Sequence, residues 1–312
     1  MADAFIPPRP CGQTCRQAGR TTNACTTDAK PSFYKRSLPE QCTAFSSRQG
    51  KALFASALQH HGLRSFFCLM EQYTTQSEPD YCGISTLVVV LNALAVDPHR
   101  TWKGPWRWYH EHMLNCCIAL EDVQKTGITL RDFVYLSLCQ GLSVQATHCE
   151  GDEHLETFRQ AVAEACIEDE ESDSDKPMQI LVVSYSRQVL GQTGTGHFSP
   201  IAAYDQASDK VLVLDTARFK YGAHWVDLPT MFNAMRPHDP ETNRSRGFAL
   251  LSFEPVPGQS RDCEKCGDNV CDCPQPASLL YRSKLSADAL RREYMAFVDN
   301  KSDVTWKDVY SF

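Results

Sequence analysis

The segment from Cys82 to Val96 constrains the fold more than any other part of this 312-residue sequence. Its apolar residues recur at the three- and four-residue spacing of an α-helix, and Pro98 ends the pattern. These residues are Ile84, Leu87, Val88, Leu91, Leu94 and Ala95. Three consecutive valines would also suit a strand, but the segment is too long for one. Because it is apolar nearly all round, we expect a buried helix that begins at Cys82.

Helices are predicted on both sides of this segment, and strands follow them. Residues 51–69 predict a helix and then a turn, and residues 119–138 predict one or two further helices. After Pro177, apolar runs rich in β-branched residues predict strands. The predicted strands are Met178–Tyr185, Ile201–Tyr204, Lys210–Asp215 and Gly247–Phe253. Helices first and an antiparallel sheet second make an α+β fold in which both halves share one core. A polar helix at Ser278–Asp299 is expected at the periphery.

The charge pattern excludes two classes of partner. Lys and Arg number 31 and Asp and Glu number 38, which gives a net charge of −7. Much of that excess lies in the acidic run Glu168–Asp175, which we interpret as a solvated loop. The rest is nearly neutral, and no apolar run approaches the roughly 20 residues of a membrane helix. We therefore expect neither a nucleic acid nor a membrane as partner.

Fifteen cysteines are the unusual feature of the composition. Residues 1–32 are rich in Pro, Gly, Thr and Asn and lack the apolar stretch of a signal peptide, so we expect a loose tail and a cytoplasmic protein. Cytoplasmic thiols stay reduced. So many reduced thiols indicate nucleophilic chemistry, a soft metal, or burial.

Cys82 is the first candidate for nucleophilic chemistry. A cysteine at a helix N-terminus meets the positive end of the helix dipole, which favours the thiolate. Typical thiol pKa values there fall from about 8.5 into the range of about 3.5–7.5. The alternative is a buried, unreactive cysteine, the commonest fate of this residue.

A cysteine nucleophile needs an imidazole beside it and a third group that orients the ring. His197 opens the first strand of the predicted hairpin, and Asp215 ends the second. If Tyr204 pairs with Lys210, His197 and Asp215 become diagonal neighbours on one face, about 7–8 Å apart at the backbone. Each residue alone would suit a structural role. Their placement across one hairpin and the chain order Cys, His, Asp match papain-like enzymes.

Gln76 and a glycine-rich stretch complete the predicted site. Gln76 lies shortly before Cys82, so its side-chain amide is a candidate to form an oxyanion hole with the Cys82 N–H. The alternative for Gln76 is a surface loop position. The stretch Gly191–Gly196 lacks the Lys-Ser/Thr pair of a phosphate loop, and we interpret its glycines as letting a substrate backbone approach His197.

Four cysteines near the C-terminal end form a second candidate site. They are Cys263, Cys266, Cys271 and Cys273. Four thiolates so close together suit a soft ion such as Zn²⁺, Cd²⁺ or Cu⁺. Their spacing is tighter than that of a zinc ribbon, so we predict a metallothionein-like cluster, with an exposed loop as the alternative.

Several segments of the chain resemble the motifs of phytochelatin synthases. The segment around Cys82, QSEPDYCG at 76–83, resembles the nucleophile motif of that family. Similar matches are LNALA at 91–95, WKGPWRW at 102–108, GTGHFSP at 194–200, DTARFKY at 215–221 and RGF at 246–248. The resemblance extends from about Phe33 to Phe253. The chain departs from the family at Asp80, where Ala is usual, and at Tyr135, where plant members have a cysteine.

This resemblance implies a fold, a domain organisation and an activity. The fold is that of papain-like cysteine proteases, in which a helical N-terminal lobe packs its nucleophile helix on an antiparallel sheet. A loose tail at 1–32 would precede a catalytic domain at 33–255 and a short Cys-containing extension at 256–312. The implied enzyme is a γ-glutamylcysteine dipeptidyltransferase. It removes glycine from glutathione, holds γ-Glu-Cys as a thioester, and passes it to glutathione or a growing phytochelatin.

The family's functional residues fall on those chosen from the residues alone. The implied triad is Cys82, His197 and Asp215, with Gln76 as the oxyanion residue. Substrate binding is assigned to Glu78, Gly196, Arg218 and Arg246. The two arginines suit the carboxylates of glutathione. No organic cofactor is expected, and Cd²⁺ or Zn²⁺ would act as activator mainly as its glutathione thiolate complex.

Two alternatives stay open on the sequence. The same triad suits a hydrolase that removes glycine from glutathione or its conjugates. The thiols alone suit a soft-metal buffer without catalysis. The expected partners are glutathione, phytochelatins and heavy-metal ions, and a homodimer is an assembly that the sequence allows.

Overall fold

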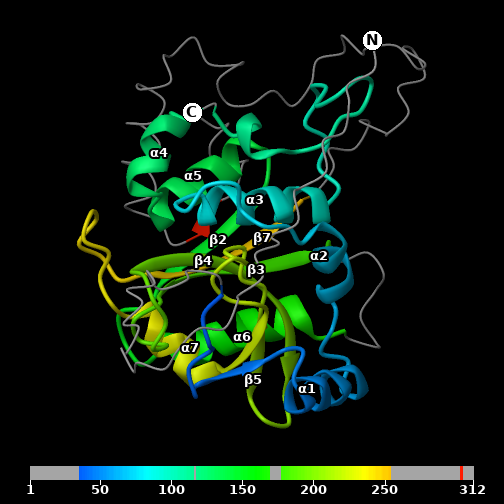
Figure 1. Ribbon diagram of the computed structural model, residues 1–312, viewed down its shortest axis with the longest axis vertical. Coiled ribbons are helices and arrows are strands. Elements are labelled where there is room, and N and C mark those ends of the chain that lie inside the picture. Colours follow the sequence, from blue (N-terminus) through cyan, green and yellow to red (C-terminus); the bar gives the residue numbers. More distant parts are fainter. Residues whose placement is uncertain (1–34, 116, 169–176, 254–302, 305–312) are drawn as a thin grey trace, which may run out of the picture. The chain divides into compact units, whose positions relative to one another are not determined.

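The centre of the protein is one antiparallel sheet (Figure 1). The computed structural model describes residues 35–115, 117–168, 177–253 and 303–304, and all of them belong to the unit Tyr34–Phe312. The described strands follow the order β1-β6-β5-β4-β3-β7-β2-β8. They are β1 (Cys42–Ala44), β2 (Ser143–His148), β3 (Gln179–Ser186), β4 (Gly196–Asp205), β5 (Lys210–Val213), β6 (His224–Asp227), β7 (Gly247–Ser252) and β8 (Asp303–Val304).

Helices cover both faces of this sheet. On one face lie α3 (Cys82–Ala93), α4 (Leu120–Thr126) and α5 (Leu130–Cys139), and on the other lie α6 (His154–Cys166) and α7 (Leu228–Met235), as Figure 1 shows. The remaining helices are α1 (Arg48–Gln59), α2 (Phe66–Gln72) and the 3-10 turn η1 (Glu111–Met113).

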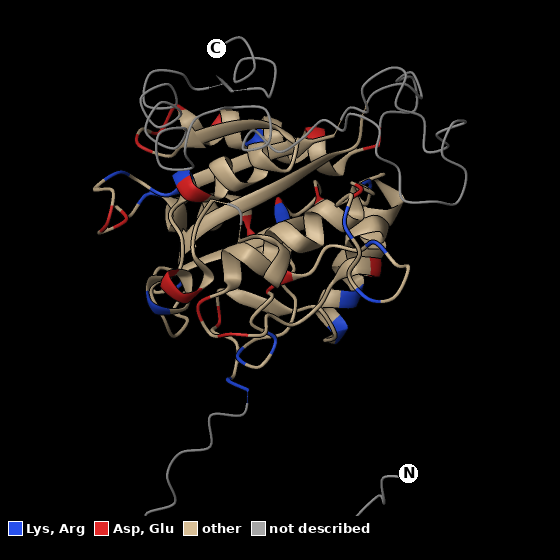
Figure 2. Cartoon of the chain, turned by 90° about the horizontal axis from the view of Figure 1, so that it is seen from above, with Lys and Arg blue, Asp and Glu red and all other residues tan. Residues whose placement is uncertain are grey.

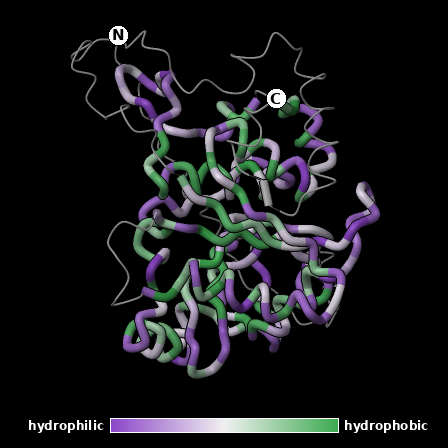
Figure 3. Tube along the Cα trace, turned by 180° about the vertical axis from the view of Figure 1, so that it is seen from behind, coloured by the Kyte–Doolittle hydropathy of each residue, from purple (hydrophilic) through white to green (hydrophobic). Residues whose placement is uncertain are grey.

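Strand β3 explains why the sheet needs two helical layers. Ile180 and Val182 join the core formed with α3 and α5, while Leu181 and Val183 join the core formed with α6 and α7. Successive residues of a strand face opposite sides, so a strand covered on both faces is apolar without interruption. In Figure 3 the hydrophobic colour accordingly runs along the central strands. The charged segments in Figure 2 lie mostly at the periphery.

The α+β prediction is confirmed, and most of the predicted elements are present. Helix α3 begins at Cys82 as predicted and is buried throughout Gly83–Leu91, but it ends at Ala93, before the predicted end. The predicted helix at 51–69 is the pair α1 and α2, and the region 119–138 is the pair α4 and α5. Strands β3, β4, β5 and β7 match the predicted strands, with β4 starting earlier. Strands β1, β2, β6 and β8 and helices α6 and α7 were not predicted. The proposed helix at 278–299 and most of the acidic run lie outside the described residues.

The predicted hairpin register is wrong near the turn and right near the site. Asp205, and not Tyr204, faces Lys210, so the strands are shifted by one residue beside the turn. A bulge between Ile201 and Ala203 absorbs one residue and restores the predicted pairing beyond it. Alternation of apolar residues does not reveal a bulge, yet the bulge decides which side chains share a face.

In the described part of the chain, none of the helices is both long and apolar enough to cross a bilayer.

Candidate active site

Cys82 is the first residue of α3, at the point where this helix meets the sheet. Gly83 permits the close approach, because a Cβ there would lie 2.5 Å from the Ile128 side chain and 3.3 Å from the Phe198 ring. Phe198 follows His197 on β4, and its backbone hydrogen-bonds to the Cys82 thiol. Cys82 packs against the apolar core but keeps part of its surface exposed. The helix therefore presents a partly accessible thiol beside the strand that carries the predicted imidazole.

His197 and Asp215 are in direct contact. Nε2 of His197 lies 2.8 Å from Oδ1 of Asp215, and both side chains are buried. The geometry at Nε2 does not meet the criteria of a hydrogen bond, so we describe the pair as a close polar contact. Strand pairing fixes both residues: Tyr185 on β3 faces His197, and the Leu214 N–H donates to the Pro200 carbonyl at 3.1 Å. The structure thus brings together the two residues that the hairpin argument paired.

Arg187 is a residue of this site that the sequence did not reveal. It follows β3, is 2 % exposed, and binds both carboxylate oxygens of Asp215. Its Nη1 lies 2.8 Å from Oδ2, and its Nη2 donates to Oδ1 at 2.9 Å. The Ala217 N–H donates to Oδ1 as well, at 2.9 Å. An arginine at a strand end normally reaches solvent, so no local pattern indicates a buried one.

These contacts set the protonation states of the site. Burial and the charge of Arg187 lower the pKa of His197 to about 4, although Asp215 opposes the shift. Burial alone would raise the pKa of Asp215, but His197 and Arg187 hold it well below its usual range. Burial raises the pKa of the Cys82 thiol, and the hydrogen bond from the Phe198 backbone and the charge of Arg187 offset this only in part. Burial therefore acts against the thiolate that the helix N-terminus favours, and it also favours the neutral form of the His197 imidazole.

Gln76 braces the loop that precedes α3. Its Nε2 donates to the carbonyl oxygens of Glu78 at 2.9 Å and Pro79 at 2.7 Å, and its Oε1 accepts from the Thr216 hydroxyl at 3.2 Å. The Gln76 N–H also donates to the Thr216 carbonyl at 3.0 Å, which ties this loop to the segment after β5. Because the two carbonyls take both amide hydrogens, an oxyanion role requires one of these hydrogen bonds to open. That role stays a prediction.

A second buried side chain, Glu111 in η1, holds the same loop. Its carboxylate accepts from the Ser77 N–H at 3.1 Å and from the hydroxyls of Ser77 and Ser85. Ser85 lies on α3, so one carboxylate links the loop to the first turn of the helix. No local motif marks Glu111, because its partners lie 26 and 34 residues away in the sequence.

Two of the predicted substrate residues, Gly196 and Arg246, are neighbours beside His197. A Cβ on Gly196 would lie 2.5 Å from Nη1 of Arg246, so a larger residue there would require the guanidinium to shift. Arg246 is buried and pairs with Asp239 at 2.9 Å. The carboxylate of Asp239 offsets part of the positive charge of Arg246, so Arg246 would bind a substrate carboxylate less strongly than an unpaired arginine.

Arg218 is the more accessible of the two predicted arginines. It is exposed, and its guanidinium carbon lies 4.8 Å from the ring centre of Tyr73. The Tyr73 hydroxyl donates to the main-chain carbonyl of Asp215 at 2.6 Å, so the ring that Arg218 contacts is anchored at Asp215. Glu78, the fourth predicted substrate residue, is half-buried in the loop before α3.

The predicted metal cluster is not tested by the described residues. Cys263, Cys266, Cys271 and Cys273 all lie outside them, so the cluster stays a prediction. Within the described part of the chain, no group of three or more His, Cys, Asp or Glu side chains is placed to hold a metal ion.

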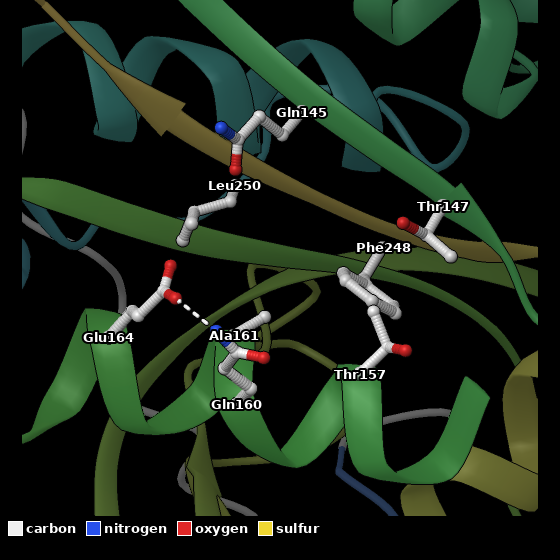
Figure 4. Close-up of a pocket in the computed structure, with 8 residues that line it drawn as sticks. All are labelled: Gln145, Thr147, Thr157, Gln160, Ala161, Glu164, Phe248 and Leu250. Carbon is white, nitrogen blue, oxygen red and sulfur yellow. Dashed lines mark hydrogen bonds between the residues drawn. The ribbon is translucent and has the colours of Figure 1, made fainter. Parts of the chain in front are cut away.

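A groove of about 150 Å³ lies between α6 and strands β2 and β7 (Figure 4). Its lining residues are Gln145, Thr147, Thr157, Gln160, Ala161, Glu164, Phe248 and Leu250. None of them is a predicted site residue, and the volume is below the roughly 300–1,000 Å³ of typical small-molecule sites. We therefore assign no ligand to this groove.

Comparison with known proteins identifies the family. A sequence model described as phytochelatin synthase matches residues 33–248. The chain is 45 % identical to the glutathione gamma-glutamylcysteinyltransferase of Schizosaccharomyces pombe, over 73 % of this chain and 53 % of that protein. It is 45 % identical to glutathione gamma-glutamylcysteinyltransferase 1 of Arabidopsis thaliana, over 72 % of this chain and 44 % of that protein. The chain spans about half the length of the curated relatives it matches. Because the match extends over most of the sequence, the chain belongs to the phytochelatin synthase family, and the matched range contains the predicted triad residues Cys82, His197 and Asp215.

Proposed function

We propose that the chain is a γ-glutamylcysteine dipeptidyltransferase that makes phytochelatins from glutathione through a thioester on Cys82. The observation that carries the proposal is the 2.8 Å contact of His197 with Asp215, beside a cysteine at the start of a buried helix. The name shared by the relatives, glutathione gamma-glutamylcysteinyltransferase, supports the substrate and the transferred group. A papain-like packing of the nucleophile helix on the sheet is part of this proposal.

In the acylation step, His197 acts as the base for Cys82. Because Asp215 holds Nε2, the other ring nitrogen, Nδ1, takes the thiol proton. The sulfur attacks the carbonyl carbon of the Cys–Gly bond of glutathione. The Cys82 N–H, with Gln76 as the second predicted donor, stabilises the oxyanion. His197 then gives its proton to the glycine nitrogen, the C–N bond breaks, and γ-Glu-Cys remains as the thioester.

In the transfer step, the free amine of a second glutathione or of a phytochelatin attacks the thioester. His197 takes the proton from the attacking amine, and the departing sulfur of Cys82 takes that proton back. Arg218 is the accessible cation for a substrate carboxylate, while Glu78, Gly196 and Arg246 complete the proposed substrate-binding set.

Heavy-metal ions enter the proposal as part of the substrate. Cd²⁺ or Zn²⁺ joins the thiolates of two glutathione molecules, and the complex offers an amine whose neighbouring thiol is blocked. The bond that breaks is the Cys–Gly amide, so the reaction does not need a free substrate thiol. The cysteines at 263–273 would serve as an accessory soft-metal site. We place the protein in the cytoplasm, where such thiols stay reduced.

The test incubates the full-length chain with glutathione and Cd²⁺, and separately with S-methylglutathione without metal. We expect γ-Glu-Cys oligomers by mass spectrometry in the first reaction and their S-methylated counterparts in the second. The peptide that contains Cys82 should carry the γ-Glu-Cys adduct in the first reaction and the S-methyl-γ-Glu-Cys adduct in the second. Cys82→Ser should lose the adduct and the products. Cys68→Ser is the matched control, because Cys68 is also a partly buried free cysteine but lies on α2, outside the site.

Three results would contradict the proposal. Formation of γ-Glu-Cys and glycine without oligomers would make the protein a hydrolase. If Cys82→Ser still made the products, a thioester on Cys82 would be excluded as the intermediate. Metal binding without turnover in the wild type would leave only a soft-metal buffer.

A further inference from the structure

A line of buried polar side chains continues from the triad into the interior. Nη1 of Arg187, which binds Asp215, also donates to Oε1 of Gln192. Nε2 of Gln192 lies 3.0 Å from Nε2 of His224, and Nδ1 of His224 lies 2.9 Å from the carbonyl oxygen of Gly222. Gln192 is 4 % exposed and His224 is 0 % exposed. The line therefore runs through the interior from Asp215 to a backbone carbonyl.

The chemistry of the groups fixes the direction of every hydrogen bond in this line. The Gly222 carbonyl only accepts, so Nδ1 of His224 carries the proton and Nε2 is an acceptor. Gln192 must then turn its NH₂ group to His224, and the second amide hydrogen points at the Cys42 sulfur at 3.7 Å. The Gln192 oxygen is thereby left for Arg187, which has only donors. Reversing the Gln192 amide would place donors against donors at Arg187.

Neutral His224 is required by this arrangement. A proton on Nε2 would place a donor against the NH₂ group of Gln192, and the Gln192 amide would have to flip to present its oxygen. Burial lowers the pKa of His224, and the charge of Arg187 acts in the same direction, although Asp215 and the Gly222 carbonyl oppose the shift. The uncharged imidazole is thus the form that fits the line.

Three separate parts of the chain contribute to this line. Arg187 follows β3, Gln192 lies in the loop between β3 and β4, and His224 begins β6. The Gln192 N–H donates to the Arg187 carbonyl at 2.8 Å, and the Arg187 N–H donates to the Thr195 carbonyl at 2.8 Å. The loop is therefore closed on itself around the side chain of Arg187.

We propose that Gln192 and His224 are positioning residues for the triad, which act by holding the Arg187 guanidinium in the orientation that fixes Asp215. This inference rests on the proposed function. Oδ1 of Asp215 receives Arg187 and the Ala217 N–H and also touches His197, so a rotated guanidinium would move the oxygen that orients the imidazole. Loss of Gln192 would leave an N–H of the buried Arg187 guanidinium without its acceptor. A buried donor without an acceptor is unfavourable, so we expect the guanidinium to rotate toward another acceptor.

The test compares four variants of the full-length chain. Gln192→Met and His224→Phe remove the line, whereas His224→Gln keeps it, because an amide both donates to the Gly222 carbonyl and accepts from Gln192. Trp225→Phe is the matched control: Trp225 follows His224 on β6, is fully buried, and loses one hydrogen bond, to the Gly50 carbonyl at 3.1 Å. Two rates are measured: the single-turnover acylation of Cys82 by glutathione, and the alkylation of Cys82 by iodoacetamide as a function of pH, with thermal unfolding as a check of folding.

We expect Gln192→Met and His224→Phe to lower the acylation rate by about 10–100-fold, by analogy with the loss of groups that orient a metal-bound histidine, with the KM for glutathione unchanged. Both should shift the pH profile of Cys82 alkylation. His224→Gln and Trp225→Phe should keep the rate and the profile of the wild type.

The alkylation readout separates this inference from the proposed function, because it needs no glutathione. A wild type that is not acylated, with alkylation profiles that shift as expected, would reject the function and support the positioning role. A folded Gln192→Met with the wild-type alkylation profile would overturn the positioning role. If Gln192→Met does not fold, equal profiles for His224→Phe and His224→Gln would overturn it.

Discussion

Replacement of Arg187 by methionine tests the electrostatic basis of the site. Asp215, which is 0 % exposed, would lose contacts of 2.8 and 2.9 Å and keep only His197 and the Ala217 N–H. Removal of one partner from a buried ion pair costs about 3–5 kcal/mol, because the other charge stays buried without compensation. At about 2–4 °C per kcal/mol for a unit of this size, we expect Tm to fall by about 6–20 °C near neutral pH.

This loss should shrink as the pH falls. Burial and Arg187 together hold the pKa of His197 at about 4, so removal of the arginine lets that pKa rise. Between the old and the new pKa, the folded variant binds a proton that the folded wild type does not, while the unfolded chains bind equally. The stability of the variant relative to the wild type therefore rises by up to about 1.4 kcal/mol for each pH unit of acidification within this window.

Urea unfolding of Arg187→Met and the wild type, followed by circular dichroism at about pH 8 and about pH 5.5, measures both effects. Arg159→Met is the matched control, because the pair of Arg159 and Asp209 is about one-third exposed and should contribute less than about 1 kcal/mol. The reasoning would be refuted if Arg187→Met lost no more free energy of unfolding than the control. Equal losses at the two pH values would refute the assigned link to His197.

Three further predictions concern the triad and its packing. Asp215→Asn should lower single-turnover acylation by about 10⁴-fold in a chain that still folds, because an amide misorients His197; a near-normal rate would make Asp215 merely structural. Gly83→Ala should lower the free energy of unfolding by about 1–3 kcal/mol in urea titrations, since the new methyl overlaps Ile128. The double variant with Ile128→Ala should lose less than the two single losses combined, and simple additivity would argue against the overlap. Acylation by the wild type should fall as the pH drops through about 4, where His197 becomes protonated and stops accepting the proton of Cys82; a constant rate there would exclude His197 as the base.

Local patterns predicted the parts of the fold that local physics determines. Helix α3 follows from its own periodicity, and strand β3 follows from its apolar run. The hairpin of β4 and β5 placed His197 near Asp215 because strand pairing is regular over a few residues. The bulge on β4 was missed, since the residues around it are apolar on both faces and give no alternation to read.

The missed residues depend on contacts between distant segments. Glu111 reaches Ser77 and Ser85 across the loop after α3, and His224 meets Gln192 only because β6 lies near β4 in the sheet. Arg187 is charged but buried, whereas an arginine at a strand end is normally exposed to solvent. Such residues are recognised only after the fold shows which distant groups form hydrogen bonds or ion pairs with them.

Burial that favours a neutral Cys82 thiol suits a protein proposed to act on metal thiolates. A soft cation binds the thiolate form of cysteine, so it must first displace the proton of Cys82. Burial raises the pKa of Cys82 and lowers that of His197, which makes this displacement unfavourable while no substrate is bound. In the proposed reaction, attack on the glutathione carbonyl changes the balance, because the proton moves to His197, beside Asp215, as the sulfur forms its bond to carbon. Burial therefore makes Cys82 a weaker nucleophile before substrate binds. The same burial favours the protonated thiol over metal binding, so Cys82 stays available for the metal complexes on which the protein is proposed to act.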